Sequence, residues 1–367
     1  MQRLFLSPPH MSGQEQHYIA QAFESNYIAP IGPMLTRFEA AICEQCEVPF
    51  ALATTSGTAA IHLALRVIGL QKDDIVLASS FTFIGSVAPI LYENATPFFI
   101  DSDQKSWNIS PTLLKRAIKE APKKPKALII THLYGQSCSL EKIVAICKEH
   151  NIILIEDAAE SLGATYNKKP TGSFGDFGIY SFNGNKLLTT SGGGVLVSHK
   201  KEWIDKARFY ATQAKDDAPY YEHTEYGYNY RMSNIVAAIG VAQMEVLDER
   251  VAQARQVFSW YQDQLKEIDE ISFMPELLNT QGNRWLTTLT FAKTDPIQVQ
   301  IALEDANIES RPLWKPMHLQ PLFKEALALE NGVSQKLFET GLCLPSGTQI
   351  LRDDVVRVCD IIKKVLV

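Results

Sequence analysis

Residues 172–198 read GSFGDFGIYSFNGNKLLTTSGGGVLVS, and this stretch decides the fold. Two apolar runs typical of strands, GIYSF (178–182) and GGVLVS (193–198), enclose a loop that carries Lys186 among glycines and small polar residues. Glycines let a backbone approach a ligand closely. A lysine in such a loop can be a Schiff-base nucleophile when its surroundings favour the neutral amine. A phosphate contact or a salt bridge within the loop is the alternative.

Upstream of this stretch, apolar runs alternate with helical patterns. The further strand-like runs are FALATT (50–55), DIVLASS (74–80), TPFFID (96–101), KALIITHL (126–133) and IILIED (152–157). Several are apolar at consecutive positions, as in a strand buried on both faces. The segments 58–67 and 140–149, and the one that follows Ser110 and Pro111, are typical of helices. The alternation predicts an α/β protein with a mostly parallel sheet of seven strands.

The last third has a different pattern. Residues 233–265 predict a long helical stretch that breaks near Asp248, followed by strands near 284–292, a helix near 296–305 and a C-terminal helix from Asp353. A chain of 367 residues exceeds what one hydrophobic core usually serves. We therefore expect a large domain over residues 1–245 and a smaller α/β domain over residues 246–367.

Composition narrows the class of protein. With 46% hydrophobic and 21% charged residues the chain is typical of soluble globular proteins. A net charge of −6 argues against a broad nucleic-acid surface, and no apolar run approaches the roughly 20 residues that span a bilayer. Six cysteines make no disulfide framework, and Cys43 and Cys46 lack the further ligands of a metal site. We expect a cytoplasmic protein without a metal, a membrane segment or a nucleic-acid partner.

Two further motifs lie near predicted strand ends, where doubly wound sheets bind ligands. TTSGTAA (54–60) combines hydroxyls and a glycine at the start of a helix, which suits a phosphate, although plain helix capping also explains it. In EDAAE (156–160), a carboxylate after an apolar strand could bind a cationic ring nitrogen, a metal or a ribose, or cap a helix.

Two other features are ambiguous when taken alone. YGYNYRMS (226–233) crowds aromatic and amide groups around an arginine, and an aromatic packing patch with a cap at Ser233 explains it equally well. His132 follows a predicted strand and could approach the site, or could be a packed structural histidine.

Taken together, the motifs fit one ligand. A phosphate cradle, a carboxylate for a ring nitrogen and a lysine are the groups that pyridoxal phosphate needs. The lysine forms an imine with its aldehyde, and the carboxylate keeps the pyridine nitrogen protonated.

These motifs resemble the DegT/DnrJ/EryC1/StrS sugar aminotransferases. The likeness rests on SGTAAIHLAL, SSFTF, EDAAESLGA, residues 172–198, the stretch from GYNYRMS to residue 255, and RPLWKPMHLQPLF, and runs in order from SPPHMSG to LPSGT at 344–348. It implies the aspartate-aminotransferase fold (fold type I), with a large mixed seven-stranded sheet domain and a small C-terminal domain. SPPHMSG, NYIAP and RPLWKPMH resemble the subgroup that aminates UDP-4-keto-6-deoxy-N-acetylglucosamine on the route to bacillosamine or legionaminic acid.

The resemblance implies roles for individual residues. Lys186 matches the Schiff-base lysine, and Asp157 the carboxylate that faces the pyridine nitrogen. Glu160 matches the residue near the cofactor's phenolic oxygen, where many members have Gln or His. The further cofactor contacts that it implies are Gly57, Thr58 and Ser181 at the phosphate, Asn229 at the phosphate of the partner subunit's cofactor, and Phe83 stacked on the ring, with Phe81 as the competing choice. Arg311, Lys315 and His318 are candidates for the diphosphate or the sugar, or belong to an ordinary charged loop.

The resemblance also implies the reaction. L-glutamate donates the amino group, a nucleotide-linked keto sugar accepts it at C4, and Lys186 moves the protons within a homodimer whose active sites are shared. A dTDP-linked or 3-keto sugar is the alternative within enzymes. The family's dehydratase branch carries histidine in place of the lysine, and Lys186 argues against it. A catalytically silent regulator that binds the cofactor and nucleic acid is the alternative from another class.

Overall fold

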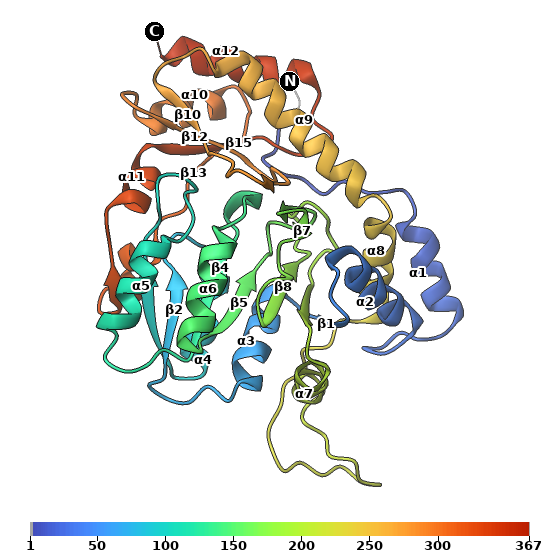
Figure 1. Cartoon of the computed structure of the whole chain (residues 1–367). Helices are drawn as coiled ribbons and strands as arrows, with labels where there is room; N and C mark the ends of the chain where they lie inside the picture. Colours follow the sequence, from blue (N-terminus) through green and yellow to red (C-terminus); the bar gives the residue numbers. More distant parts are fainter. Residues whose placement is uncertain (1–2, 367) are drawn as a thin grey trace.

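The computed structural model describes residues 3–366, and its centre is an eight-stranded sheet in the order β1-β9-β8-β5-β4-β2-β3-β14 (Figure 1). The seven predicted strands are all present: β1 (Phe50–Thr54), β2 (Ile75–Ser79), β3 (Thr96–Ile100), β4 (Ala127–Thr131), β5 (Ile153–Asp157), β8 (Phe177–Ser181) and β9 (Gly194–Ser198). β9 runs antiparallel to both of its neighbours, and the other seven strands of this sheet all run in one direction. The predicted mostly parallel α/β sheet is confirmed. It holds eight strands rather than seven because β14 (Leu327–Leu329), from the last third of the chain, pairs with β3.

Helices cover both faces of this sheet. One face packs against α3 (Gly57–Val67), α4 (Ile84–Tyr92) and α7 (Lys201–Ala211). The other face packs against α2 (Pro33–Cys46), α5 (Pro111–Glu120), α6 (Leu140–His150) and α8 (Asn234–Met244), and α1 (Glu15–Glu24) packs on α8. Burial on both faces is why β2 and β4 are apolar or small at every position.

The long helical stretch breaks as expected, between α8 and α9 (Leu247–Leu265). Beyond it lies a second lobe, whose four-stranded sheet has the order β10-β12-β15-β13. Its strands are β10 (Ile271–Phe273), β12 (Thr287–Phe291), β13 (Arg311–Pro312) and β15 (Gly341–Leu344). A separate core joins this sheet to α9, α10 (Pro296–Asp305) and α12 (Arg352–Val365), and α11 (Val333–Thr340) also contacts it. In Figure 1 this lobe lies above the carboxyl ends of the large sheet's parallel strands.

Several segments connect the two lobes. β11 (Thr280–Gln281) pairs with β6 (Thr165–Tyr166), which pairs with β7 (Lys169–Pro170). Leu4, near the start of the chain, forms a bridge with Ile308 of the small lobe. The predicted boundary after residue 245 falls between α8 and α9 and stays a prediction, because β14 and the first residues cross that division.

Two further observations concern the whole described chain. None of the helices within residues 3–366 has the length and apolar character that crossing a membrane requires. The six cysteines are all free thiols.

Candidate functional site

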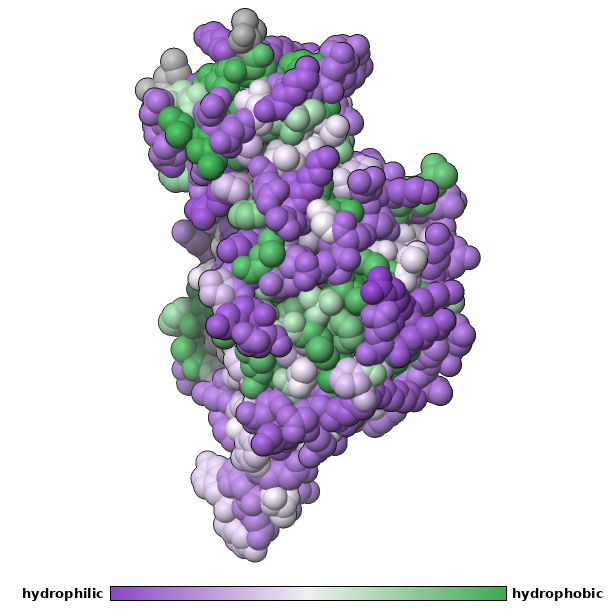
Figure 2. Space-filling view, turned by 90° about the vertical axis from the view of Figure 1, so that its left-hand side faces the viewer, coloured by the Kyte–Doolittle hydropathy of each residue, from purple (hydrophilic) through white to green (hydrophobic). Residues whose placement is uncertain are grey.

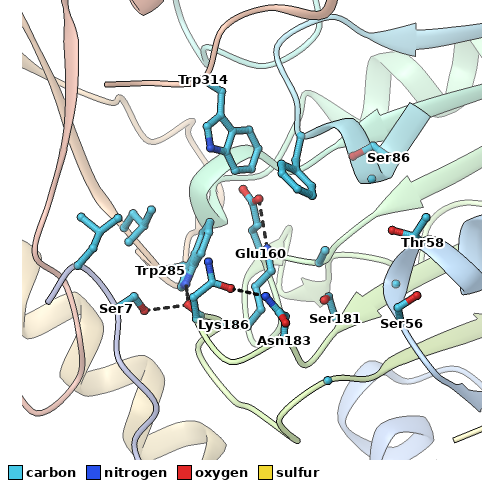
Figure 3. Close-up of a pocket in the computed structure, with 18 of the residues that line it drawn as sticks. Ser7, Ser56, Thr58, Ser86, Glu160, Ser181, Asn183, Lys186, Trp285 and Trp314 are labelled. Atoms are coloured by element: carbon cyan, nitrogen blue, oxygen red, sulfur yellow. Dashed lines mark hydrogen bonds and ion pairs between the residues drawn. The ribbon is translucent and has the colours of Figure 1, made fainter. Parts of the chain in front are cut away.

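A cavity of about 920 Å³ lies at the carboxyl ends of the parallel strands, beneath the small lobe. Figure 3 shows Ser56, Thr58 and Ser181 on one side of it and Ser7 and Trp285 on the other, with Lys186 and Glu160 between. We call the first side the strand end of the cavity and the second the lobe end. Seven predicted site residues of the large lobe line it: Gly57, Thr58, Phe83, Asp157, Glu160, Ser181 and Lys186.

The strand end is built around the N-terminus of α3. Ser56 caps this helix, because its Oγ accepts a hydrogen bond from the amide of Ala59 at 3.1 Å. The amides of Gly57 and Thr58 lie in the first turn, where N–H groups have no partner within a helix. A Cβ added at Gly194 would lie 2.3 Å from the amide nitrogen of Gly57, so only glycine lets β9 pass this turn. Free amides, hydroxyls and the helix dipole together suit an anion.

Asp157 ends β5 and is buried at the floor of the cavity. Its Oδ2 accepts a hydrogen bond from Ser86 Oγ at 2.5 Å, and its Oδ1 accepts one from the amide of Ala159 at 3.0 Å. The hydroxyl of Ser86 also contacts Thr82, and Thr82 contacts Thr131 at the end of β4. This buried chain of hydroxyls fixes the carboxylate in one orientation.

Lys186 and Glu160 meet in the middle of the cavity. Lys186 Nζ lies 3.4 Å from Glu160 Oε1 and 4.3 Å from the ring centre of Trp285. An ammonium over an aromatic face is attracted by the ring electrons. Lys186 is therefore held between a carboxyl group and a ring, facing the space that Asp157 also lines.

The second oxygen of Glu160 is fixed by the backbone. Oε2 accepts a hydrogen bond of 2.7 Å from the amide of Tyr134, a residue of the short helix η1 (Leu133–Gly135) with a left-handed φ of 51°. That backbone conformation is uncommon outside glycine. Burial raises the pKa of the Glu160 carboxyl to about 7, and the neighbouring Lys186 opposes this rise.

Glu156 and His132 form a separate, structural pair. His132 Nε2 lies 2.9 Å from Glu156 Oε2, and both side chains are fully buried. The amide of Cys138 donates to Nδ1 of His132, which leaves Nε2 to donate to Glu156. Glu156 also accepts hydrogen bonds from the amides of residues 172, 174 and 175. Of the two alternatives for His132, the structure therefore supports the packed structural histidine.

Phe83 and Phe81, the two candidates for the aromatic side chain stacked on the cofactor ring, differ in exposure. Phe83 is 57% exposed, lines the cavity, and lies 5.7 Å from Trp314 between ring centres. Phe81 is 2% exposed and packs edge-on against Tyr134. Phe83 is the residue that can contact a ligand in the cavity.

At the lobe end, only one of the three predicted substrate contacts lines the cavity. Arg311 does so, with its side chain 69% exposed and its guanidinium 2.8 Å from Glu309. Lys315 is exposed and lies outside the lining. His318 is also outside it, because its Nδ1 is bound to Ser80 Oγ at 2.6 Å beside β2.

Sequence reasoning missed most of the lobe end. The carbonyl of Asn185 accepts hydrogen bonds from Ser7 Oγ at 2.9 Å and from Trp285 Nε1 at 2.7 Å, next to the lysine (Figure 3). Trp314 and Ser86 also line the cavity. Ser7 lies in SPPHMSG and Trp314 lies in RPLWKPMH, two motifs that supported the family resemblance. Their positions in these motifs could have identified them as candidate site residues. Trp285 lies in residues 284–292, for which the sequence predicted only strands and no site residue.

Asn229 is not among the residues that line this cavity. It is exposed on the segment between α7 and α8, two residues before Arg231, and forms a bridge with Thr212. Figures 1 and 2 show the part of this segment that precedes Asn229 as a narrow projection below the body of the molecule. Its role toward a partner subunit stays a prediction. The expected absence of a metal also stays a prediction. Within residues 3–366, no three His, Cys, Asp or Glu side chains form a group that could hold a metal ion.

Comparison with known proteins finds the same family along nearly the whole chain. The model of the DegT/DnrJ/EryC1/StrS aminotransferase family matches residues 9–363. The putative pyridoxal phosphate-dependent aminotransferase EpsN of Bacillus subtilis is 51% identical, with 98% of this chain and 95% of the relative covered. GDP-perosamine synthase of Caulobacter vibrioides is 34% identical, with coverage of 100% and 99%. A DegT/DnrJ/EryC1/StrS aminotransferase structure from Brucella abortus superimposes with a TM-score of 0.90 at 25% identity, covering 96% and 95% of the two chains.

The residues present fit pyridoxal phosphate, the cofactor of this family. The first turn of α3 and the hydroxyls of Thr58 and Ser181 offer donors to a phosphate, and a buried, oriented carboxylate is available for a ring nitrogen. The amine of Lys186 reaches into the same space. A Cβ added at Gly85 would lie 2.9 Å from Thr58 Oγ1, so a glycine keeps this cradle open.

Proposed function

Because the chain belongs to the DegT/DnrJ/EryC1/StrS aminotransferase family, we propose that it transfers the amino group of L-glutamate to C4 of a UDP-linked 4-keto-6-deoxy-N-acetylhexosamine. The general activity of this family is that of a sugar aminotransferase that depends on pyridoxal phosphate. The product would be a UDP-linked 4-amino-4,6-dideoxy sugar for bacillosamine- or legionaminic-type glycans.

One observation carries the proposal: Lys186, Asp157 and the N-terminus of α3 line a single cavity. Pyridoxal phosphate, when bound, supplies an aldehyde that carries the amino group and a ring that withdraws electrons. Asp157 is oriented to keep the ring nitrogen protonated. The amides of Gly57 and Thr58 and the hydroxyl of Ser181 are placed to bind the phosphate.

Lys186 moves the protons. Its Nζ takes the proton from Cα of the donor, and later delivers one to C4 of the sugar, which fixes the configuration there. The aromatic side chains of Phe83, Trp285 and Trp314 line the same cavity as this amine.

The nucleotide has room at the lobe end. A cavity of about 920 Å³ is at the upper end of the range for drug-sized ligands and exceeds what the cofactor alone requires. Arg311 is the cation there that a diphosphate would meet. A GDP-linked 4-keto sugar is the second candidate substrate, because a relative that is 34% identical over the whole chain is named GDP-perosamine synthase.

We also propose that the site is completed in a homodimer. The projection that precedes Asn229 exposes Tyr220, Tyr221 and Tyr226, which are large rings more typical of an interface than of a free loop tip. In that dimer, Asn229 would contact the phosphate bound by the neighbouring subunit.

The test is direct amino transfer. The purified protein with pyridoxal phosphate and L-glutamate is incubated with UDP-, GDP- and dTDP-linked 4-keto sugars and with a 3-keto sugar, and any amino sugar is identified by NMR. We expect product with the UDP-linked 4-keto sugar. The Lys186→Ala variant is expected to lose at least about 10⁴-fold in kcat, since it removes the covalent and proton-transfer group together. Transfer by Lys186→Ala at the wild-type rate would contradict the assignment of the lysine. Absence of transfer together with a DNA gel shift would favour the regulator.

A further inference from the structure

Three carboxyl groups lie at or just beyond the end of β5, and only one of them contacts Lys186. Glu156 is bound to His132 and to three backbone amides, and no hydrogen bond or ion pair joins it to Lys186. Asp157 is bound to Ser86 and the amide of Ala159. Glu160 alone reaches Lys186 Nζ, at 3.4 Å (Figure 3).

Glu160 is also held so that this contact persists. The Tyr134 amide binds Oε2 at 2.7 Å, and this leaves Oε1 directed at the amine. Trp285 covers the other side of Nζ, 4.3 Å from its ring centre. Glu160 is 5% exposed, so bulk water has little access to the pair.

We propose that Glu160 is the proton-exchange partner of Lys186, an inference that rests on the proposed aminotransferase function. A lysine side chain ordinarily carries an extra proton at neutral pH, and it must lose that proton before it can act as a nucleophile or base. Glu160 Oε1 accepts the proton from Nζ, giving a carboxylic acid and a neutral amine, and returns it in the reverse step. No other reactant is needed, because one proton moves between two groups in contact.

The surroundings favour exchange near neutral pH. The titratable groups that face Glu160 are Lys186, Asp157, Tyr134 and Cys343. Burial raises the pKa of the Cys343 thiol to about 12 and that of the Tyr134 hydroxyl well above its ordinary value, so both stay neutral. Burial raises the pKa of Glu160 to about 7, with Lys186 opposing the rise. The carboxylate, which is the form that accepts a proton, therefore gains population as the pH rises through about 7.

The test uses cofactor loading of the otherwise unmodified protein. Pyridoxal phosphate is mixed with cofactor-free protein across the pH range, the linkage is trapped with borohydride, and the labelled fraction at Lys186 is followed by mass spectrometry. For the wild type we expect the loading rate to rise through a step near pH 7. For Glu160→Gln we expect the step to vanish and loading above it to slow by about 100-fold, the lower end of what a positioned acid–base group contributes.

Two variants keep the result interpretable. Glu160→Asp retains a carboxyl group and is expected to restore part of the step that Gln removes. Glu309→Gln removes another carboxyl group that lines the cavity, but at a position where it is bound to Arg311 and the amide of Leu6, and it should keep the step. Circular dichroism of each variant confirms folding.

A step near pH 7 that persists in Glu160→Gln overturns the proposal. The same holds if the step vanishes equally in Glu309→Gln. Loss of the step in Glu160→Gln alone supports proton exchange even if no keto sugar is aminated, in which case only the proposed substrate fails.

Discussion

The two ends of the cavity are built in different ways. The strand end comes from short motifs at the carboxyl ends of β1, β5 and β8, so each group is positioned by a strand of the same sheet. The lobe end comes from residues 5–9, 285–286 and 309–314, which are far apart in sequence. Under the proposed function, the first end would bind the cofactor common to the family, and the second would face the part of the substrate that varies. Local sequence therefore specifies the strand end more directly than the lobe end.

Of the substitutions that test this difference between the two ends, Asp157→Asn at the strand end has the largest expected effect. The amide keeps the size of the side chain and can still contact Ser86, but it removes the carboxylate that the proposed function places opposite the cofactor's ring nitrogen. We expect kcat to fall by about 10³-fold, as when one preorganised electrostatic contact is lost, with the KM for the keto sugar little changed. Steady-state kinetics with both substrates measures this.

The control is Ser86→Ala, which removes one hydrogen bond to Asp157 and leaves its charge. Its loss in kcat should be about tenfold, in keeping with one hydrogen bond to a charged group. If Asp157→Asn lost no more than Ser86→Ala, charge at this end would not matter, and the contrast between the two ends would fail.

Arg311→Gln is the corresponding test at the lobe end. Arg311 is exposed and contacts Glu309, so its removal leaves no buried group unpaired. We expect the KM for the nucleotide sugar to rise about tenfold, equivalent to about 1.4 kcal/mol, with kcat and the KM for glutamate changed by less than about twofold.

Lys315→Gln is the matched control, since it removes a cation of the same sequence motif that lies outside the cavity lining. Its kinetic constants should equal those of the wild type. A similar rise in KM for both variants would mean that the field of the whole motif, and not the position of Arg311, attracts the substrate.

The same contrast explains what could be predicted from sequence. The seven strands predicted for the large sheet are all present, and burial on both faces explains the continuous apolar runs of β2 and β4. β14 was missed because Leu327–Leu329 is too short to show a pattern, and only its pairing with β3 makes it a strand. The break between α8 and α9 was found close to its place.

Within the site, Lys186, Asp157, Gly57 and Thr58 carried their chemistry in local motifs, and they do line one cavity. The hydrogen bonds from Ser7 and Trp285 to the carbonyl of Asn185 could not be predicted, because they join three distant segments. The motif RPLWKPMH identified a cationic segment, but the choice among its cations depends on which side chain faces the cavity. His318 faces Ser80 instead.

The smallest predicted effect comes from removing a helix cap, and it tests whether Ser56 only caps α3 or also binds the ligand at the strand end. Ser56→Ala removes the N-cap of α3, and Ser233→Ala removes the N-cap of α8, where Ser233 Oγ accepts from the amide of Val236 at 3.3 Å. Each should lower the free energy of unfolding of the cofactor-free protein by about 1 kcal/mol, measured by urea denaturation. Only Ser56 lines the cavity, so only Ser56→Ala should also weaken cofactor binding, which equilibrium dialysis measures. Equal cofactor affinity in the two variants would reduce Ser56 to a structural cap and leave phosphate binding to the amides of α3 and the hydroxyls of Thr58 and Ser181.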